Sequence, residues 1–289
     1  RMFIGGGDPG GTFGTGVLTI ANSATVLVAQ AGTFPNDAIY LGGYGGNGRI
    51  NLDGGVLAMS REIKMGSGGP GVLVYNGGIL RAVNNGFTIN ANVTSTVGVN
   101  RAIFDPNGLG ITNNAALLPN GTSVDGGIVN IGAGVTVLAG NSSYVGPTFV
   151  SNGTLQAGNG GTTGTFGTND ATVVSGATLA FNRNNGHTIN HRIVGAGSVQ
   201  LNSPTNGDYA ITGSNGLFTG SFLVSKARMQ LDNTNDFGNA TIINVQTGGQ
   251  VYATAALTYS IPLTLNGSGW GEAAGFLCAL RLQGGTWAG

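Results

Sequence analysis

Charged residues are scarce in this chain of 289 residues: they make up 8% of it, where a typical globular domain has about 25%. Eleven basic and eleven acidic side chains cancel to a formal net charge of zero, and Lys64 and Lys226 are the only lysines. Binding to nucleic acid needs clustered Lys and Arg that neutralise phosphates, so the composition argues against a nucleic-acid partner. A neutral surface also lacks the charge repulsion that keeps proteins apart, which favours association.

Cysteine and long apolar runs are nearly absent as well. The single cysteine, Cys278, excludes an internal disulfide framework. Its apolar surroundings, GFLCALRL, predict a buried small side chain and not a reactive thiol. No run approaches 18 consecutive apolar residues, so we predict no membrane span in this segment. No window of 11 residues carries a capped amphipathic pattern, which predicts almost no helix.

Residue patterns for metal binding and catalysis are incomplete. His187 and His191 are the only histidines, and on a strand they would stand about 13 Å apart, too far to share an ion. We therefore expect them to be solvated or hydrogen-bonded. The run GGYGGNGRI at 42–50 resembles a calcium-binding nonapeptide, but Asn47 and Arg49 replace its Asp and its apolar residue. Asp232 and Asp236 lack EF-hand spacing.

The other acidic residues are spread singly, and glycosidic hydrolysis needs two neighbouring carboxylates. The sequence accordingly predicts no catalytic residue, no cofactor and no metal site, and hence a protein that is not an enzyme.

Glycine is abundant, with 56 residues, and hydrophobic residues make up 40% of the chain. The absence of a three-residue period excludes collagen, and the high apolar content excludes disorder. Since charge is rare, Asn, Thr, Ser and Gly must form the surface, which is more typical of a secreted fibre than of a cytoplasmic enzyme.

A repeat appears early in the chain. GRINLDGGVLAM at 48–59 aligns with GVLVYNGGILRA at 71–82, 23 residues later. Apolar residues two apart predict strands with one buried face, and the Gly-Gly pairs supply positive φ at corners. The alignment also places Asp53 one coil away from Asn76. A fixed period in this range indicates a solenoid.

Two all-β folds fit this pattern. An antiparallel fold such as a sandwich would use the Asn-Gly pairs as hairpin turns. We favour a right-handed parallel β-helix (solenoid) of roughly 12 coils, because the repeats align like upon like. Residues 1–289 would form a single β-helix segment of a longer polypeptide. A loop excursion is expected near residues 90–126, where Pro106 and Pro119 interrupt the pattern.

The stretch LAGNSSYVGPTFVSNGTLQAG at 138–158 resembles the autotransporter-associated β-strand repeat of bacterial passenger proteins. The residues that match it in order are Gly140, Asn141, Tyr144, Gly146, Thr148, Val150, Gly153, Thr154, Leu155 and Gly158. A weaker second copy spans residues 211–231. It has Asn215, Phe218 and Gly220 at the positions of Asn141, Tyr144 and Gly146, but Ala227, Arg228 and Met229 replace the Gly-Thr-Leu signature.

This resemblance implies a non-catalytic bacterial protein at the cell surface or in the extracellular space, acting as a structural fibre or adhesin-like passenger stalk. Because neither end of the sequence shows a polar cap, we expect further repeats of the same chain, or copies of it stacked head-to-tail into filaments, as partners. Glycans and host or cell surfaces are other candidate partners.

The alternative is a carbohydrate-binding or polysaccharide-cleaving β-helix module. It would expose aromatic rings, with Tyr40, Tyr44 and Trp270 as candidates, although core or corner packing is the expectation for these rings.

Overall fold

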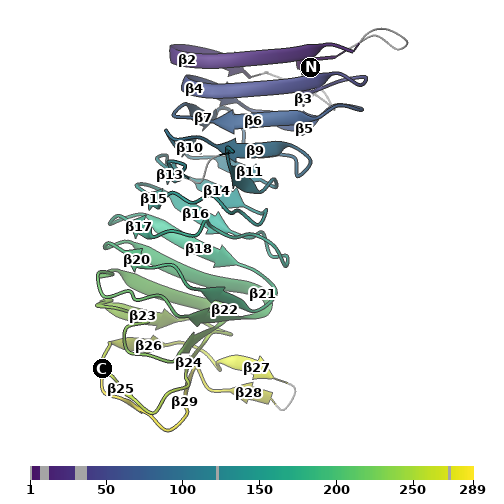
Figure 1. Ribbon diagram of the computed structural model, residues 1–289. Helices are drawn as coiled ribbons and strands as arrows, with labels where there is room; N and C mark the ends of the chain where they lie inside the picture. The colour runs from purple at the N-terminus through teal and green to yellow at the C-terminus, as the bar shows by residue number, and fades with distance from the viewer. Residues whose placement is uncertain (1, 7–12, 30–37, 122–123, 273–274) are drawn as a thin grey trace. The chain divides into compact units, whose positions relative to one another are not determined.

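The computed structural model describes residues 2–6, 13–29, 38–121, 124–272 and 275–289. Every regular element in these ranges is a β-strand, and parallel sheets stack as a β-solenoid of about ten turns (Figure 1). This confirms the predicted all-β parallel solenoid, with a number of turns close to the expected 12. None of the described residues belongs to a helix that could cross a membrane.

The chain divides into two compact units. The first unit comprises Arg1–Thr148 and Gly164–Thr168, and the second comprises Phe149–Thr163 and Asn169–Gly289. The boundary between the units falls within strand β15 (Thr148–Val150), because Thr148 belongs to the first unit and Phe149 to the second.

Two series of parallel strands build the first unit. One series pairs in the order β1 (Met2–Ile4), β3 (Ala38–Leu41), β5 (Glu62–Met65), β8 (Phe87–Ile89), β11 (Gly110–Asn113) and β14 (Val135–Leu138). The other begins with two long strands, β2 (Thr15–Val28) and β4 (Asn47–Met59). It continues from β4 along two paths, namely β6 (Gly71–Tyr75), β9 (Thr94–Val97) and β12 (Leu117–Pro119), and β7 (Ile79–Ala82), β10 (Ala102–Asp105) and β13 (Ile128–Asn130). The stretch 90–126 thus contains strands β9 to β12.

The 23-residue period sets the register of the early coils. Gly48 pairs with Gly71 and Val56 with Ile79, as the alignment of the two sequences predicts. Asn76 donates a hydrogen bond to the Asp53 carboxylate over 3.1 Å, which confirms that these corner residues stack. At this corner Gly54 has a φ of 95°, a conformation that a residue with a Cβ rarely adopts.

Like residues stack in the core of the first unit because the strands are in register. Ile39 pairs with Ile63 and Ile63 with Ile89, and all three side chains are fully buried. A shift of one residue would move such a column to the outer face, so burial fixes the register.

The second unit repeats this arrangement. Its main series pairs in the order β16 (Thr154–Ala157), β18 (Thr178–Asn182), β21 (Ser198–Ile211), β22 (Ser221–Leu231), β23 (Ile242–Val245) and β26 (Leu263–Leu265). The remaining parallel pairs are β19 (His187–Ile189) with β21, β24 (Gln250–Ala253) with β22 and β29 (Leu280–Leu282), β17 (Ala171–Val173) with β20 (Ile193–Val194), and β25 (Thr258–Tyr259) with β30 (Thr286–Trp287). β27 (Trp270–Glu272) and β28 (Gly275–Leu277) pair antiparallel.

The core of the second unit also consists of columns. Leu155, Leu179, Val199, Phe222 and Ile243 lie above one another in successive strands and are all fully buried. Each coil therefore covers the apolar side chains of the next.

Candidate functional site

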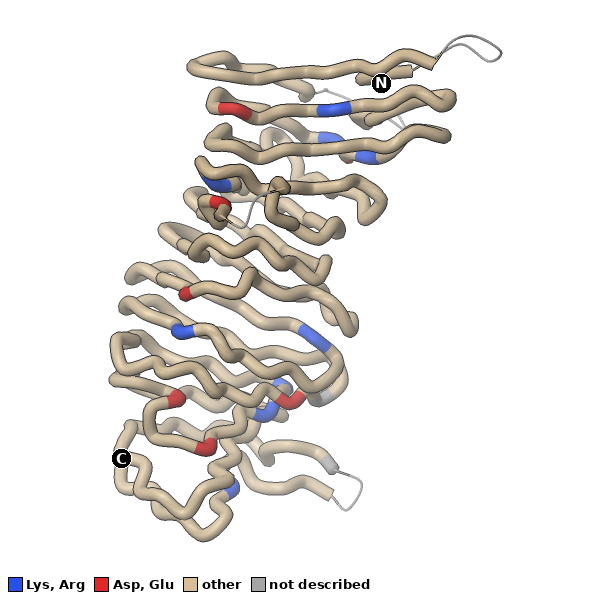
Figure 2. Tube along the Cα trace, viewed as in Figure 1, with Lys and Arg blue, Asp and Glu red and all other residues tan. Residues whose placement is uncertain are grey.

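Charged residues are few, and their positions are scattered along the backbone of each unit (Figure 2). Several of them pair with a charge about one coil away. In the first unit Arg81 Nε lies 2.6 Å from Asp105 Oδ2, and in the second unit Arg228 pairs with Asp208. These pairs neutralise charge locally and link neighbouring coils.

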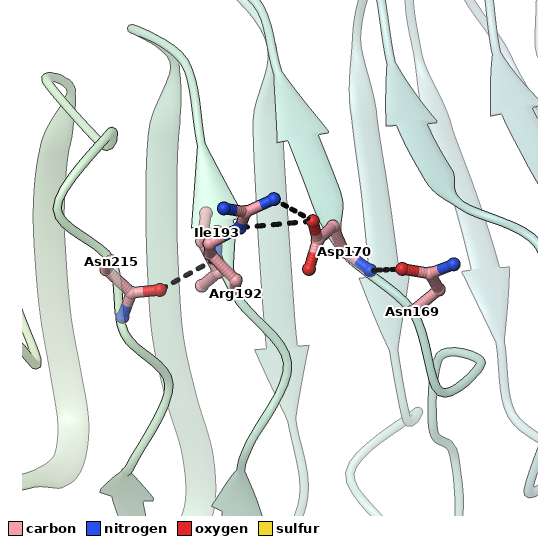
Figure 3. Close-up of polar contacts among 5 residues, drawn as sticks. All are labelled: Asn169, Asp170, Arg192, Ile193 and Asn215. Carbon is pink, nitrogen blue, oxygen red and sulfur yellow. Dashed lines mark hydrogen bonds and ion pairs between the residues drawn. The ribbon is translucent and has the colours of Figure 1, made fainter.

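Asn215 lies in a group of polar contacts that joins neighbouring coils of the second unit (Figure 3). Its side chain is fully buried. The Asn215 Oδ1 accepts a hydrogen bond from the Ile193 N–H over 2.7 Å, and its Nδ2 donates to the Asp236 carbonyl over 2.6 Å. Next to Ile193, the Arg192 Nε donates to Asp170 over 3.0 Å. Asn215 thus connects the backbone of the preceding coil to that of the following coil.

Asn141 makes a related contact in the first unit. Its Oδ1 accepts a hydrogen bond from the Gly164 N–H over 2.9 Å, 23 residues further along the chain. Asn141 is exposed whereas Asn215 is buried. The two aligned asparagines therefore share a role, which is to bond backbone about one coil away.

The aligned aromatic residues Tyr144 and Phe218 fill the core, since both are fully buried. The Tyr144 hydroxyl lies 2.7 Å from the Thr148 hydroxyl, and burial raises the pKa of Tyr144. Phe218 packs edge-on against Phe222 with ring centroids 5.1 Å apart. The tyrosine of the repeat thus needs a hydroxyl partner, which the phenylalanine of the second copy does not.

The aligned glycines are required by close packing. A Cβ on Gly146 would overlap the Gly127 amide nitrogen, and a Cβ on Gly220 would overlap the Gly197 carbonyl oxygen. Both glycines therefore allow backbone from neighbouring coils to approach closely.

Asp125 is a further structural residue, which the sequence analysis missed. Its side chain is buried and accepts hydrogen bonds from the backbone N–H groups of Gly127, Val145 and Gly146, over 2.7–2.8 Å. Such bonds satisfy a buried carboxylate. The Asp-Gly-Gly run at 125–127 could have indicated this role, because an Asp side chain commonly accepts a hydrogen bond from the backbone N–H two residues further along.

The two histidines lie near one aromatic ring, Phe181, in the second unit. The Phe181 ring centroid lies 6.2 Å from that of His187 and 6.3 Å from that of His191. His191 is buried, so of the two expected states, solvated or hydrogen-bonded, its side chain is not solvated. Burial, followed by the charge of Arg183 and the neighbouring His191, lowers the pKa of His187 to about 4. His187 is therefore uncharged at neutral pH.

The Asp236 side chain bonds to the backbone of the loop that precedes it. It is buried, and its Oδ2 accepts the N–H groups of Asp232 and Asn233, each over 2.8 Å. Burial raises the pKa of Asp236 to about 6, and the charge of Asp232 adds to this. The carboxylate thus closes a turn. Within the described ranges, no three His, Cys, Asp or Glu side chains gather closely enough to hold a metal ion.

Cys278 is exposed, so the prediction of a buried side chain is wrong. It directly follows β28, in which Phe276 is 70% exposed. The apolar sequence around Cys278 therefore lies in and next to the β27–β28 hairpin, on its exposed side.

The candidate aromatic platforms differ in exposure. Trp270 is buried and lies beneath the Arg228 guanidinium, 5.1 Å from ring centroid to Cζ, so it acts as core. Tyr44 is 52% exposed. Tyr40 is partly buried and stacks on Phe3, which is 53% exposed.

Asn141, Tyr144 and Gly146, whose contacts are described above, belong to a segment that matches a known family of sequence repeats. Residues 128–157 match the family model of the passenger-associated-transport-repeat. This match confirms the resemblance of this segment to a passenger repeat. The passenger-associated-transport-repeat and the solenoid together fit an autotransporter passenger domain, a class of secreted or surface-exposed protein. No curated protein and no solved structure shows a significant match to the chain.

Proposed function

We propose that this chain is a non-catalytic structural stalk within an extracellular bacterial passenger. The observation that carries the proposal is the in-register stacking of like residues within each unit, as in the Ile39, Ile63 and Ile89 column. In such an array each coil is stabilised by its neighbours, so length can be added without a new fold. A stalk needs this property, because its function is to span a distance.

The polar corners support a stabilising role for the surface. Asn76 bonds Asp53 on one side, and its Oδ1 accepts the Asn100 N–H over 3.1 Å on the other. In the second unit the hydroxyls of Ser198 and Ser221 lie 3.1 Å apart. Amide and hydroxyl groups thus bond along the stacking direction, and such ladders, which contain no pair of opposite charges, tolerate changes in salt better than exposed ion pairs.

Head-to-tail assembly is the second element of the proposal. Among the described strands, β2 is paired with β4, and its outer residues Val17 and Leu27 are 57% and 65% exposed. A long strand with exposed apolar residues favours addition of a further strand. Another coil of the same polypeptide or a second copy of this chain would supply that strand.

Sedimentation velocity combined with negative-stain electron microscopy tests both elements. A stalk gives elongated particles with a high frictional ratio, and head-to-tail assembly gives particles whose length grows with protein concentration. Replacing Val17 and Leu27 by lysine should abolish the growth and leave the single particles elongated. Compact particles would contradict the stalk, and concentration-independent length would contradict assembly of separate copies.

A further inference from the structure

An aromatic ladder lies on the outer face of β1, β3 and β5 in the first unit. The parallel register places Phe3 beside Tyr40 and Tyr40 beside Lys64. The Phe3 and Tyr40 rings stack with centroids 4.9 Å apart and an interplanar angle of 17°. Lys64 Nζ lies 5.0 Å from the centroid of the Tyr40 ring. The stacked pair presents an aromatic surface, because Phe3 is 53% exposed.

Tyr44 lines the same hollow as this ladder and has a backbone conformation that is unusual for a tyrosine. It is the one bulky residue in the run GGYGGNG at 42–48, and its φ is 46°. A tyrosine is strained in this region, where glycine is favoured. The ring is 52% exposed, so burial offsets little of that cost. Strained residues of this kind cluster at binding sites, where the strain positions a side chain.

The three rings border a hollow of about 260 Å³ that is open to solvent. The residues that line it are Phe3, Tyr40, Gly43, Tyr44, Met65, Gly66 and Ser67. The hollow is smaller than the roughly 300–1,000 Å³ of sites for drug-sized ligands, so it suits a single ring. Gly43 has no side chain and therefore leaves part of the hollow empty. A Cβ built on Gly43 would lie 3.5 Å from the nearest atom of the Phe3 ring, which is an ordinary contact distance.

Among the described residues that border the hollow or its aromatic ladder, the one cation is paired with an acid. Lys64 pairs with Glu62 over 3.1 Å, so this cation is already neutralised and offers little attraction to a phosphate or carboxylate ligand. A fitting ligand is uncharged, with an apolar face for the rings and polar groups at its edge for the Ser67 hydroxyl and the backbone. A pyranose has this form, because the C–H groups of one face are slightly positive and attract the negative face of an aromatic ring. A nucleobase also stacks on aromatic rings, but its phosphate backbone needs basic residues.

We propose that the hollow bordered by Phe3, Tyr40 and Tyr44 binds one pyranose ring of a neutral glycan. The stacked pair Phe3 and Tyr40 forms one aromatic surface, and Tyr44 holds the sugar from the adjoining corner. This site would give the passenger a recognition function beside its structural one.

Saturation-transfer difference NMR on the whole 289-residue chain tests the proposal. The probes are methyl β-D-glucoside, methyl β-D-galactoside and methyl N-acetyl-β-D-glucosaminide at millimolar concentration, with a thymidine octanucleotide as the competing stacking ligand. We expect at least one glycoside to receive saturation, mainly at the C–H groups of one ring face.

Tyr44→Gly separates binding from folding. Glycine suits the positive φ, so the Tm should stay the same or rise, while affinity for the glycoside should fall about tenfold. Gly43→Ala should also weaken binding, because its methyl group enters the hollow without a clash. Phe276→Ser is the matched control, since it removes a 70% exposed ring from the second unit and should leave binding unchanged.

Three results would overturn the proposal: no transfer to any glycoside, equal transfer with Tyr44→Gly, or transfer to the octanucleotide that exceeds transfer to every glycoside. None of these results bears on the stalk, whose test is particle shape.

Discussion

Replacing Asn215 by alanine removes the side chain that links the two coils flanking it; Figure 3 shows its bond to Ile193 in the preceding coil. The change deletes the acceptor of the Ile193 N–H and the donor to the Asp236 carbonyl, at 2.7 and 2.6 Å. Asn215 and Ile193 are fully buried and Asp236 is 2% exposed, so water does not readily replace the lost partners. Leaving a buried backbone group without its partner costs about 1–3 kcal/mol, so two such groups predict a loss of about 2–6 kcal/mol.

Urea unfolding followed by tryptophan fluorescence measures this loss directly. Both tryptophans, Trp270 and Trp287, lie in the second unit together with Asn215, so the signal reports the unit that the change affects. Hydrogen exchange followed by mass spectrometry adds a local measurement. The amide of Ile193 should exchange faster in Asn215→Ala, because it has lost its acceptor.

Asn266→Ala is the control, because Asn266 is an exposed residue of the same unit. Its unfolding free energy should stay within about 0.5 kcal/mol of the unchanged protein. The reasoning would be refuted if Asn215→Ala were as stable as Asn266→Ala, or if the Ile193 amide kept its protection. Either result would mean that the buried asparagine does not hold the coils together.

Three further predictions follow from the same structure. Gly220→Ala should destabilise the second unit by about 3 kcal/mol in urea, because its Cβ would overlap the Gly197 carbonyl oxygen; Gly216→Ala, with open space around its Cβ, should change stability little. The pKa of His187 is lowered to about 4, so its neutral form stabilises the fold above pH 6.5, and this contribution is lost as the pH falls from 6.5 towards 4. His187→Gln should therefore reduce the acid-induced loss of stability in that window by on the order of 1–2 kcal/mol, measured as urea midpoints across pH; an unchanged pH profile would count against this assignment. The exposed Cys278 should react with Ellman's reagent in the native protein at one thiol per chain, whereas reaction only after denaturation would show that it is covered.

The stacking of coils could be predicted from the sequence where successive coils have equal length. The segments 48–59 and 71–82 align without gaps, and the structure pairs them at the predicted offset. The predicted contact of Asp53 with Asn76 follows from that offset alone. The repeat at 138–158 was readable for a related reason: its glycines and asparagine meet local demands for close backbone approach and backbone bonding. Alternation and turn residues determine strands and corners locally.

Contacts between coils of unequal length could not be predicted from the sequence. The offset between paired residues is 20 for Thr178 and Ser198 but 32 for Thr15 and Asn47, and no single period predicts both. Burial of His191 and exposure of Cys278 depend on which distant strand lies beside them, as do the bonds of Asp125.

The sequence by itself thus determined the strand content, the parallel stacking and the passenger repeat, because these depend on side-chain alternation and on glycine at fixed spacing. Only the tertiary structure decided which polar groups are buried and which aromatic rings gather at the surface, as Phe3, Tyr40 and Tyr44 do. Those outcomes depend on register between segments more than 20 residues apart, which the packing of whole coils sets.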